Sequence, residues 1–237
     1  MKWMTAPGDK AVDFATLYFN EPDHMGHAYG PDSDSVRVKV ERADEIMGYL
    51  KEKLQAQQLW ENSNIIVLSD HGMVEVTADK IIRLDNIIDM DQVERTIWGA
   101  LTMIQPVDGQ TEQLYQSLKA EAEHYDVYKK ADIPERYHLK YNRRVSDIVM
   151  IADLGYTILD EDYEDDFIES LPRGSHGYDN QQKAMQSIFM ARGPAFHSGA
   201  SVDAFQNVHI YELLNELMGT TPAPNDGSLD SVKVLLK

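Results

Sequence analysis

Apolar residues along this chain form short continuous runs and one long, regularly spaced series. The run Val12–Phe19 ends in the polar residues "NEPDHMGH", and the run Ile65–Leu68 ends in "SDHG". Between the two runs, apolar residues recur at alternating spacings of four and three, at Val36, Val40, Ala43, Met47, Leu50 and Leu54. This pattern predicts two buried strands separated by an amphipathic helix of about six turns.

Strand, helix and strand in this order are typical of a βαβ unit in a parallel sheet covered on both faces. We therefore expect an α/β fold with a doubly wound, mostly parallel sheet. Ligands bind such sheets at the carboxyl ends of the strands. The polar residues after Phe19 and Leu68 lie at two such ends, so we expect them to meet in space.

The rest of the chain predicts a small inserted subdomain and a return to the main sheet. Further strand regions are expected at residues 95–107, 125–135, 146–159 and 187–196, and further helices at 110–122 and 208–218. Residues 95–145 are expected to form a smaller α+β insertion. The acidic stretch "DEDYEDDFIE", residues 160–169, is expected to be a solvated loop.

Composition excludes several classes of protein. The net charge is −18, from 40 acidic and 22 basic residues, which argues against a basic nucleic-acid-binding surface. No apolar stretch reaches the length of about 18 residues that a membrane segment needs. The absence of cysteine excludes a disulfide scaffold, a thiolate metal site and a cysteine nucleophile.

Five residues in three polar segments are candidate metal ligands. Asp23 and His27 are four residues apart, with Pro22 and Gly26 expected to shape a turn, and Asp70 and His71 are adjacent. His176 lies between Gly174 and Gly177, which allow a close approach of the backbone. Zinc prefers this mixture of carboxylate oxygen and imidazole nitrogen. Taken singly, each segment is weak evidence, because a lone loop histidine is more often a surface residue than a ligand and Asp-His-Gly is commonly a turn.

The other histidines differ from these three. His124, His138, His197 and His209 lie in helical or polar stretches without the same pattern, and we interpret them as structural. His24 lies within the first segment, but no role is assigned to it.

Taken together, these segments carry a specific resemblance. "YFNEPDHMGHAYGP", "SDHGM" and "GSHGYDN", with "DIPERYH", "DIVMIAD" and the final "NVHIYELLNELMGTTPAPNDG", resemble the nucleotide pyrophosphatase/phosphodiesterase family of the alkaline phosphatase superfamily. The resemblance covers essentially the whole chain. It implies a zinc phosphodiesterase of alkaline-phosphatase-like α/β fold that acts on a small phosphodiester or nucleotide substrate.

The resemblance also implies roles for individual residues. Asp23, His27 and His176 match the ligands of one zinc ion, Asp70 and His71 match two ligands of a second zinc ion, and Tyr18 matches an aromatic residue of the substrate pocket. In the family, a Thr or Ser nucleophile forms a covalent nucleotidyl intermediate. Two metal ions can neutralise the charge that develops during such a displacement.

The nucleophile of the family lies upstream of the segment "YFNEPD", as do a further Asp ligand and an Asn that binds the phosphate. Thr5 and Thr16 are the threonines that precede Asp23 here, and neither has the surrounding sequence of the nucleophile. We therefore expect residues 1–237 to form part of a catalytic domain, incomplete on its N-terminal side, with one full zinc site and one half site. Hydrolysis by this chain alone is not expected.

Three interpretations stay open at this point. The chain is a fragment of a longer phosphodiesterase, a non-catalytic metal-binding or interaction module, or a relative that acts on phospholipid-type or phosphonate substrates. The absence of cysteine and of glycosylation sequons favours a bacterial protein, and the resemblance favours an extracytoplasmic one. The sequence does not indicate the substrate or the oligomeric state.

Overall fold

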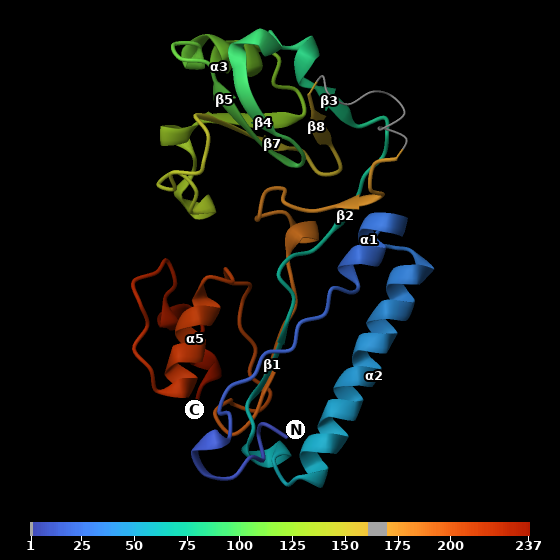
Figure 1. Ribbon diagram of the computed structural model, residues 1–237, viewed down its shortest axis with the longest axis vertical. Coiled ribbons are helices and arrows are strands. Elements are labelled where there is room, and N and C mark those ends of the chain that lie inside the picture. The colour runs from blue at the N-terminus through green and yellow to red at the C-terminus, as the bar shows by residue number, and fades with distance from the viewer. Residues whose placement is uncertain (1, 161–169) are drawn as a thin grey trace. The chain divides into compact units, whose positions relative to one another are not determined.

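The computed structural model describes residues 2–160 and 170–237, and within them the chain forms two compact units (Figure 1). The first unit consists of the residues up to Tyr18, Arg42–Asp70 and Ser187–Lys237. The second unit consists of Phe19–Glu41 and His71–Gln186. Each unit is therefore assembled from segments that are far apart in the sequence. The predicted acidic loop lies, apart from Asp160, outside the described residues.

A four-stranded antiparallel sheet forms the centre of the second unit. Its strand order is β4-β5-β7-β6, with β4 at Val93–Ile97, β5 at Leu101–Pro106, β6 at Tyr125–Lys129 and β7 at Ile148–Ala152. All five residues of β7 are buried, because β7 has a partner strand on each edge and apolar clusters on both faces.

Helix α3, Thr111–Ala120, covers one face of this sheet. Its buried residues Leu114 and Leu118 are four apart and lie on one side of the helix. They join the apolar cluster that contains Ile148 and Met150 of β7. The neighbouring residues Val149 and Ile151 belong to a second cluster, as the twofold alternation of a strand requires.

Two small sheets complete the second unit. Strand β3, Ile81–Arg83, pairs in parallel with β8, Thr157–Leu159, and β2, Val74–Glu75, pairs antiparallel with β9, Gly174–Ser175. Helix α1, Asp23–Tyr29, lies beside β9. The β2–β9 pairing joins segments about a hundred residues apart in the sequence, and the candidate ligands His71 and His176 flank these two strands.

The first unit contains a strand pair and a helix. Strand β1, Ile65–Leu68, pairs antiparallel with β10, Phe189–Arg192, and helix α5 covers His209–Met218. Its apolar cluster includes Phe196, Leu213, Val232 and Leu235 together with Ile66 and Phe189 of the two strands. Short 3₁₀ helices occur in both units, at Gly8–Lys10, Trp60–Asn62, Leu84–Asn86, Met90–Gln92, Lys130–Asp132, Glu135–Tyr137, Lys183–Met185, Leu229–Ser231 and Lys233–Leu235.

The predicted long helix is confirmed as α2, Asp34–Ala56. Its first eight residues belong to the second unit and the others to the first. Of the apolar positions that predicted it, Leu54 is buried, whereas the side chain of Val40 is 52% exposed. Among residues 2–160 and 170–237, no helix combines the length and the apolar composition needed to cross a membrane.

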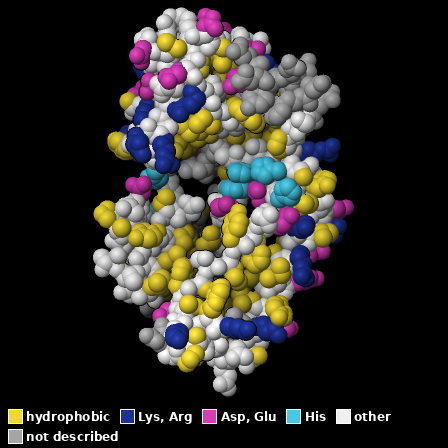
Figure 2. Space-filling view, viewed as in Figure 1, with side chains coloured by type: hydrophobic (Ala, Val, Ile, Leu, Met, Phe, Trp, Pro, Cys, Tyr) yellow, Lys and Arg dark blue, Asp and Glu magenta, His cyan; other side chains and the backbone are white. Residues whose placement is uncertain are grey.

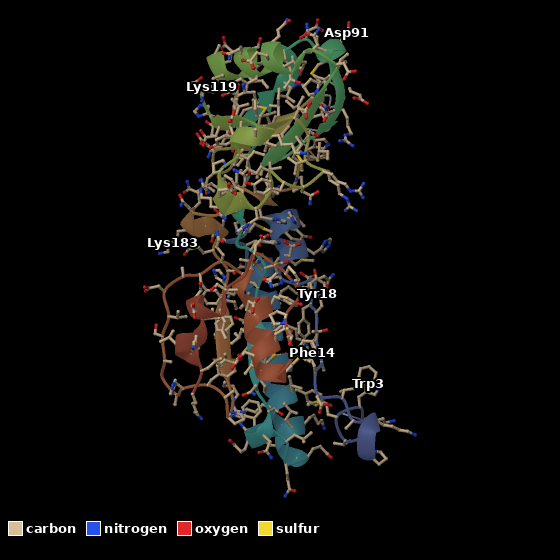
Figure 3. All side chains as sticks on the ribbon, turned by 90° about the vertical axis from the view of Figure 1, so that its left-hand side faces the viewer. Trp3, Phe14, Tyr18, Asp91, Lys119 and Lys183 are labelled. Carbon is tan, nitrogen blue, oxygen red and sulfur yellow. The ribbon has the colours of Figure 1, made fainter. Side chains whose placement is uncertain are left out.

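The prediction of a buried strand at Val12–Phe19 is wrong. The structure assigns no strand to these residues, and their apolar side chains are exposed, by 47% for Phe14, 65% for Leu17 and 82% for Tyr18. Figure 3 labels Phe14 and Tyr18 of this segment, together with Trp3 nearer the N-terminus. The physical reason is that no described segment pairs with this run as a strand. Its apolar side chains are therefore not buried in a sheet.

The α/β class is confirmed, with a mixed set of sheets. Of the described strand pairs, β3–β8 is parallel and the others are antiparallel. A doubly wound, mostly parallel sheet therefore stays a prediction.

Candidate metal centre

Helix α1 places one carboxylate and one imidazole on the same face. Asp23 lies in its first turn and His27 in its last turn. Residues four apart point in the same direction from an α-helix, so both side chains leave the helix together. The segment is thus a helix and not the turn that Pro22 and Gly26 indicated. The helix ends at Gly30, whose φ of 87° favours glycine.

Hydrogen bonds and close packing hold α1 against β9. The backbone N–H of Arg173 donates to the carbonyl oxygen of His27 at 2.7 Å, and His27 Nδ1 lies 2.7 Å from the carbonyl oxygen of Gly174. A Cβ atom at Gly174 would overlap the carbonyl oxygen of Gly26 and the sulfur of Met73. Glycine is needed at position 174 because the helix backbone approaches the strand so closely.

The β2–β9 pairing brings His71 and His176 to the same place. Val74 lies opposite Ser175, and His71 precedes β2 while His176 follows β9. In an antiparallel pair, the start of one strand meets the end of the other. The two imidazole rings accordingly stack, with centroids 3.5 Å apart and planes inclined by 15°.

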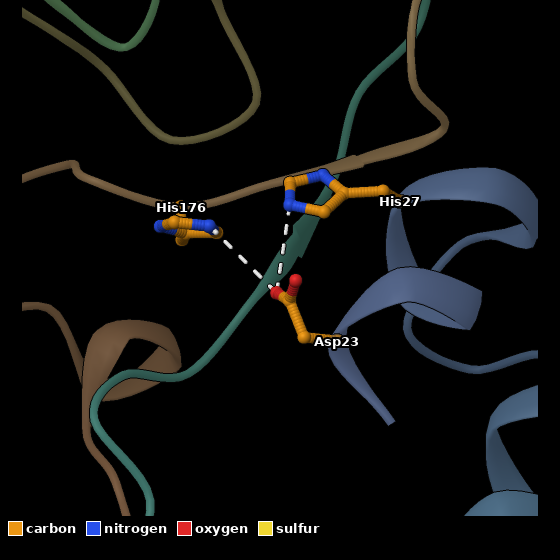
Figure 4. Close-up of side chains that lie close together, drawn as sticks. All are labelled: Asp23, His27 and His176. Atoms are coloured by element: carbon orange, nitrogen blue, oxygen red, sulfur yellow. Dashed lines mark ion pairs between the residues drawn. The ribbon is translucent and has the colours of Figure 1, made fainter. Parts of the chain in front are cut away.

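The Nε2 atoms of three histidines surround one oxygen atom. Asp23 Oδ1 lies 3.5 Å from His27 Nε2, 3.7 Å from His176 Nε2 and 4.0 Å from His71 Nε2. Figure 4 shows the carboxylate of Asp23 between the rings of His27 and His176, and Figure 2 shows histidine side chains gathered in one surface patch. Asp23, His27 and His176 offer ligand atoms that all lie within 4.8 Å of one another.

For His27 and His71, hydrogen bonds to backbone carbonyl oxygens determine which ring nitrogen carries the proton and which can act as an acceptor towards the Asp23 carboxylate. A ring nitrogen beside a carbonyl oxygen must carry the proton, since only an N–H can donate to it. Nδ1 of His27 contacts the oxygen of Gly174, and Nδ1 of His71 contacts the oxygen of Gly72 at 2.9 Å. In the neutral rings, Nε2 therefore presents a lone pair towards Asp23.

These acceptors fit a divalent cation. Asp23 Oδ1 is buried and has no hydrogen-bond partner in the part of the chain that the structure describes. A buried acceptor without a donor is costly, and several acceptors that face one another repel unless a positive charge lies between them. One carboxylate oxygen with two or three imidazole nitrogens is a ligand set that zinc takes. The group can therefore hold a metal ion.

The other two predicted site residues lie in the first unit. Asp70 is exposed and directly precedes His71, and Tyr18 is 82% exposed. Among the described residues, the group whose ligand atoms all lie within 4.8 Å of one another includes neither Asp70 nor His71. The assignment of Asp70 and His71 to a second ion, and of Tyr18 to the substrate pocket, stays a prediction.

An ion pair near His176 was not foreseen from the sequence. Arg136 contacts Asp179 through both carboxylate oxygens, and Asp179 is three residues after His176. Both residues lie within segments already quoted for the resemblance, "DIPERYH" and "GSHGYDN". Their opposite charges were a possible signal, but nothing in the local pattern joins two residues 43 positions apart.

The model of the family "type I phosphodiesterase/nucleotide pyrophosphatase" matches residues 1–179, a span that contains Asp23, His27, Asp70, His71 and His176. The chain belongs to this family. The predicted recognition is thereby confirmed, over a part of the chain that includes every candidate ligand.

Curated members of the family are similar over the whole chain or nearly so. Human ectonucleotide pyrophosphatase/phosphodiesterase family member 5 is 36% identical over 236 residues, which are all of this chain and 48% of that protein. Mouse family member 7 is 36% identical over 243 residues, which are all of this chain and 54% of that protein. Human bis(5′-adenosyl)-triphosphatase is 38% identical over 95% of this chain and 48% of that protein. The chain thus spans about half the length of these relatives.

Solved structures of the family share the fold. Murine ectonucleotide pyrophosphatase/phosphodiesterase 5 superimposes with a TM-score of 0.89 at 36% identity, over all of this chain and 61% of that one. An inactive threonine-to-alanine variant of the murine protein, in complex with AMP, superimposes with a TM-score of 0.88 at 35% identity. The fold of this chain is therefore alkaline-phosphatase-like, of the α/β class.

Proposed function

We propose that this chain carries the metal-binding part of a zinc-dependent phosphodiesterase or nucleotide pyrophosphatase. In this proposal, Asp23, His27 and His176 hold one zinc ion, while Asp70 and His71 supply part of the site of a second. The substrate is a small phosphodiester or nucleotide. The family of the chain and the name of its human triphosphatase relative support a nucleotide substrate.

One observation carries the proposal. Asp23 Oδ1 is buried without a hydrogen-bond donor among the described residues, and imidazole Nε2 atoms face it from three different segments. A structural cluster of neutral histidines would place ring N–H groups against the carboxylate. Here the Nδ1 protons of His27 and His71 point instead to backbone carbonyl oxygens, which leaves lone pairs for a cation.

The residues of the chain would contribute in distinct ways. The carbonyl oxygens of Gly174 and Gly72 orient the imidazoles of His27 and His71, so that little reorganisation is needed when an ion binds. Asp23 supplies negative charge, and its side chain is 43% exposed, which leaves the site open to a ligand. Bound divalent ions would stabilise the negative charge that develops on phosphoryl oxygens during hydrolysis.

We further propose that the nucleophile, a Thr or Ser that forms a covalent intermediate, belongs to a segment outside these 237 residues. The exposed apolar side chains of Val12–Phe19 support this proposal, because they have the pattern of a sheet strand without its neighbours. Such neighbours would also supply the doubly wound, mostly parallel sheet. Residues 95–145 would then be an insertion in that larger catalytic domain, and Tyr18 would line its substrate pocket.

The test is zinc binding by the purified, metal-free chain, measured by isothermal titration calorimetry. We expect binding of zinc that His27→Ala and His176→Ala each weaken by about 100-fold or more, since a site of three ligands loses one. The matched control is His124→Ala. His124 is also a half-exposed histidine beside a carboxylate, 3.7 Å from Asp153, and its loss should leave the affinity for zinc unchanged.

Hydrolysis of p-nitrophenyl thymidine monophosphate tests the proposed location of the nucleophile separately from the metal site. We expect the zinc-loaded chain to hydrolyse this substrate no faster than the His176→Ala variant does. Zinc-dependent turnover by residues 1–237 would contradict the location of the nucleophile outside them. Equal zinc affinity of the wild-type chain and of both histidine variants would contradict the metal site itself.

A further inference from the structure

Arg136 makes a dense set of contacts with the segment that follows His176. Its Nη1 donates to Asp179 Oδ1 at 2.5 Å and to Asn180 Oδ1 at 2.9 Å, and its Nη2 donates to Asp179 Oδ2 at 2.8 Å. In return, Asn180 Nδ2 donates to the carbonyl oxygen of Arg136 at 3.3 Å. A two-pronged pairing of this kind defines both the distance and the orientation of the two groups.

The pairing is sheltered from solvent. The side chains of Arg136 and Asp179 are 27% and 24% exposed, and the guanidinium lies 4.0 Å from the ring centre of Tyr137. Burial by itself would raise the pKa of Asp179. Hydrogen bonds from Arg136 and from the backbone N–H of Gln181 outweigh that effect, so the pKa of Asp179 is lowered. The carboxylate is therefore charged and paired at neutral pH.

The segment around His176 is held on both sides. Before it, Gly174 and Ser175 form β9, which pairs with β2. After it, Gly177 turns the chain with a φ of +94°, and the hydroxyl of the buried Tyr178 donates a hydrogen bond to the carbonyl oxygen of Tyr156 at 3.0 Å.

Asp179 follows Tyr178 in the sequence, and both of its carboxylate oxygens accept hydrogen bonds from Arg136. Because Gly177 is conformationally permissive, the contacts of Tyr178 and Asp179 restrict the conformation of the turn that follows His176.

We infer that Arg136 is a positioning residue that acts through Asp179 to hold the imidazole of His176 beside Asp23. This gives the segment "DIPERYH" a role, since Arg136 is its arginine. Arginine suits the role because its planar guanidinium pairs with both carboxylate oxygens, which the single ammonium of lysine cannot do. The part of this inference that concerns metal affinity rests on the proposed zinc site. The part that concerns the ring of His176 does not.

Two measurements on the whole chain test the inference. In the metal-free protein, long-range ¹H–¹⁵N NMR spectra report on the ring nitrogens of each histidine, with the His176 signals assigned from the His176→Ala variant. Arg136→Ala should shift and broaden the signals of His176 and leave those of His209, in the other unit, unchanged. By calorimetry, Arg136→Ala should weaken zinc binding about tenfold, as losses of second-layer contacts do.

Control variants separate positioning from general stability. Arg83 also pairs with one carboxylate through two nitrogens, at 3.0 and 3.3 Å from the oxygens of Asp85, with similar exposure of 23% and 30%. Arg83→Ala should leave the His176 signals and the zinc affinity unchanged. Arg136→Lys keeps the charge but not the two-pronged pairing, so both of its effects should be intermediate. If Arg136→Ala fails to fold, Arg136→Lys and Asp179→Asn provide the same readouts.

The possible outcomes are distinct. Unchanged His176 signals in a folded Arg136 or Asp179 variant would overturn the inference, even if the melting temperature falls. Shifted His176 signals support the inference in full if zinc affinity falls in the Arg136 and Asp179 variants and not in the control variant Arg83→Ala. Shifted signals in a chain that does not bind zinc support the positioning of His176 and contradict the proposed metal site alone.

Discussion

Strand β7 and the segment Val12–Phe19 have similar apolar composition and opposite environments. β7 reads "IVMIA", and all five of its residues are buried between β5 and β6 and between two apolar clusters. The segment "VDFATLYF" forms no strand, and its side chains Phe14, Leu17 and Tyr18 are 47–82% exposed. An apolar run therefore forms a strand only where another strand pairs with its backbone, as β10 does with β1, and it is fully buried where, as in β7, strands pair on both edges and apolar clusters cover both faces.

The same contrast explains where the candidate metal centre lies. Its candidate ligands Asp23 and His27 come from α1, and His176 directly follows β9, all within the second unit. The short β2–β9 pair has only two residues in each strand, but α1 packs on it through glycine and hydrogen bonds. Pairing, and not apolar content, determines which segments can hold side chains at fixed distances.

The largest expected effect comes from truncating one apolar side chain in each region. Met150→Ala in β7 should lower the free energy of unfolding by about 2–5 kcal/mol, because Met150 is fully buried and a cavity would remain. Leu17→Ala should change it by no more than about 0.5 kcal/mol, because that side chain is 65% exposed. Urea unfolding followed by circular dichroism measures both. Equal losses would show that Val12–Phe19 is packed in solution, which would remove the contrast.

A methyl group added at two glycines tests the close packing beside the ligands. Gly174→Ala should destabilise the protein by about 1–3 kcal/mol, since its Cβ would overlap backbone of α1 and Met73. Gly48→Ala should instead stabilise it by about 0.5–1 kcal/mol, because Gly48 lies within α2 and nothing surrounds the added Cβ. Thermal unfolding of the two variants gives the signs. A stable Gly174→Ala protein would mean that α1 and β9 are further apart than described.

The smallest expected effect concerns the Arg136–Asp179 pair and pH. At neutral pH, Asp179→Asn should cost about 1 kcal/mol of stability, since it removes a charged hydrogen-bond acceptor that is mostly shielded from solvent. The folded-state pKa of Asp179 lies below its ordinary value of 3.8. The stability that its charge provides is therefore fully present above pH 3.8 and is lost as the pH falls through the folded-state pKa.

Urea titrations of wild type and Asp179→Asn at several pH values measure this difference. The gap between the two proteins should be constant from neutral pH down to about pH 5 and should shrink at lower pH. The facing groups are Arg136, which stays charged throughout, and Tyr137, whose pKa is raised to about 12 by burial and by the charge of Asp179. A gap that grows on acidification would show that the carboxylate is not held by Arg136.

Elements with a complete local pattern could be predicted from the sequence. Strand β1 has the predicted bounds Ile65–Leu68, and the helices expected at 110–122 and 208–218 are found as α3, Thr111–Ala120, and α5, His209–Met218. In each case the spacing of apolar residues within the segment itself predicts the element, without knowledge of the segments that pack against it. The i, i+4 pair Asp23 and His27 likewise followed from spacing, although the segment is a helix and not a turn.

Elements that depend on distant partners could not be predicted in this way. Val12–Phe19 has the composition of a strand, but composition does not determine which other segments would pair with it. The pairing of Arg136 with Asp179 joins residues 43 apart, and neither residue has a local pattern that requires the other. The stacking of His71 on His176 depends in the same way on the register of β2 and β9.

The sequence by itself determined the family, the α/β class and the identity of the candidate ligands, because these depend on residue types and on spacings of a few positions. The tertiary structure alone decided that the rings of His27, His71 and His176 lie close to one buried oxygen of Asp23, and that Arg136 pairs with Asp179 in the segment after His176. Distances between such groups depend on strand register, on glycine-permitted close packing and on long-range ion pairs. These distances are set only when segments that are far apart in the sequence contact one another in the folded protein.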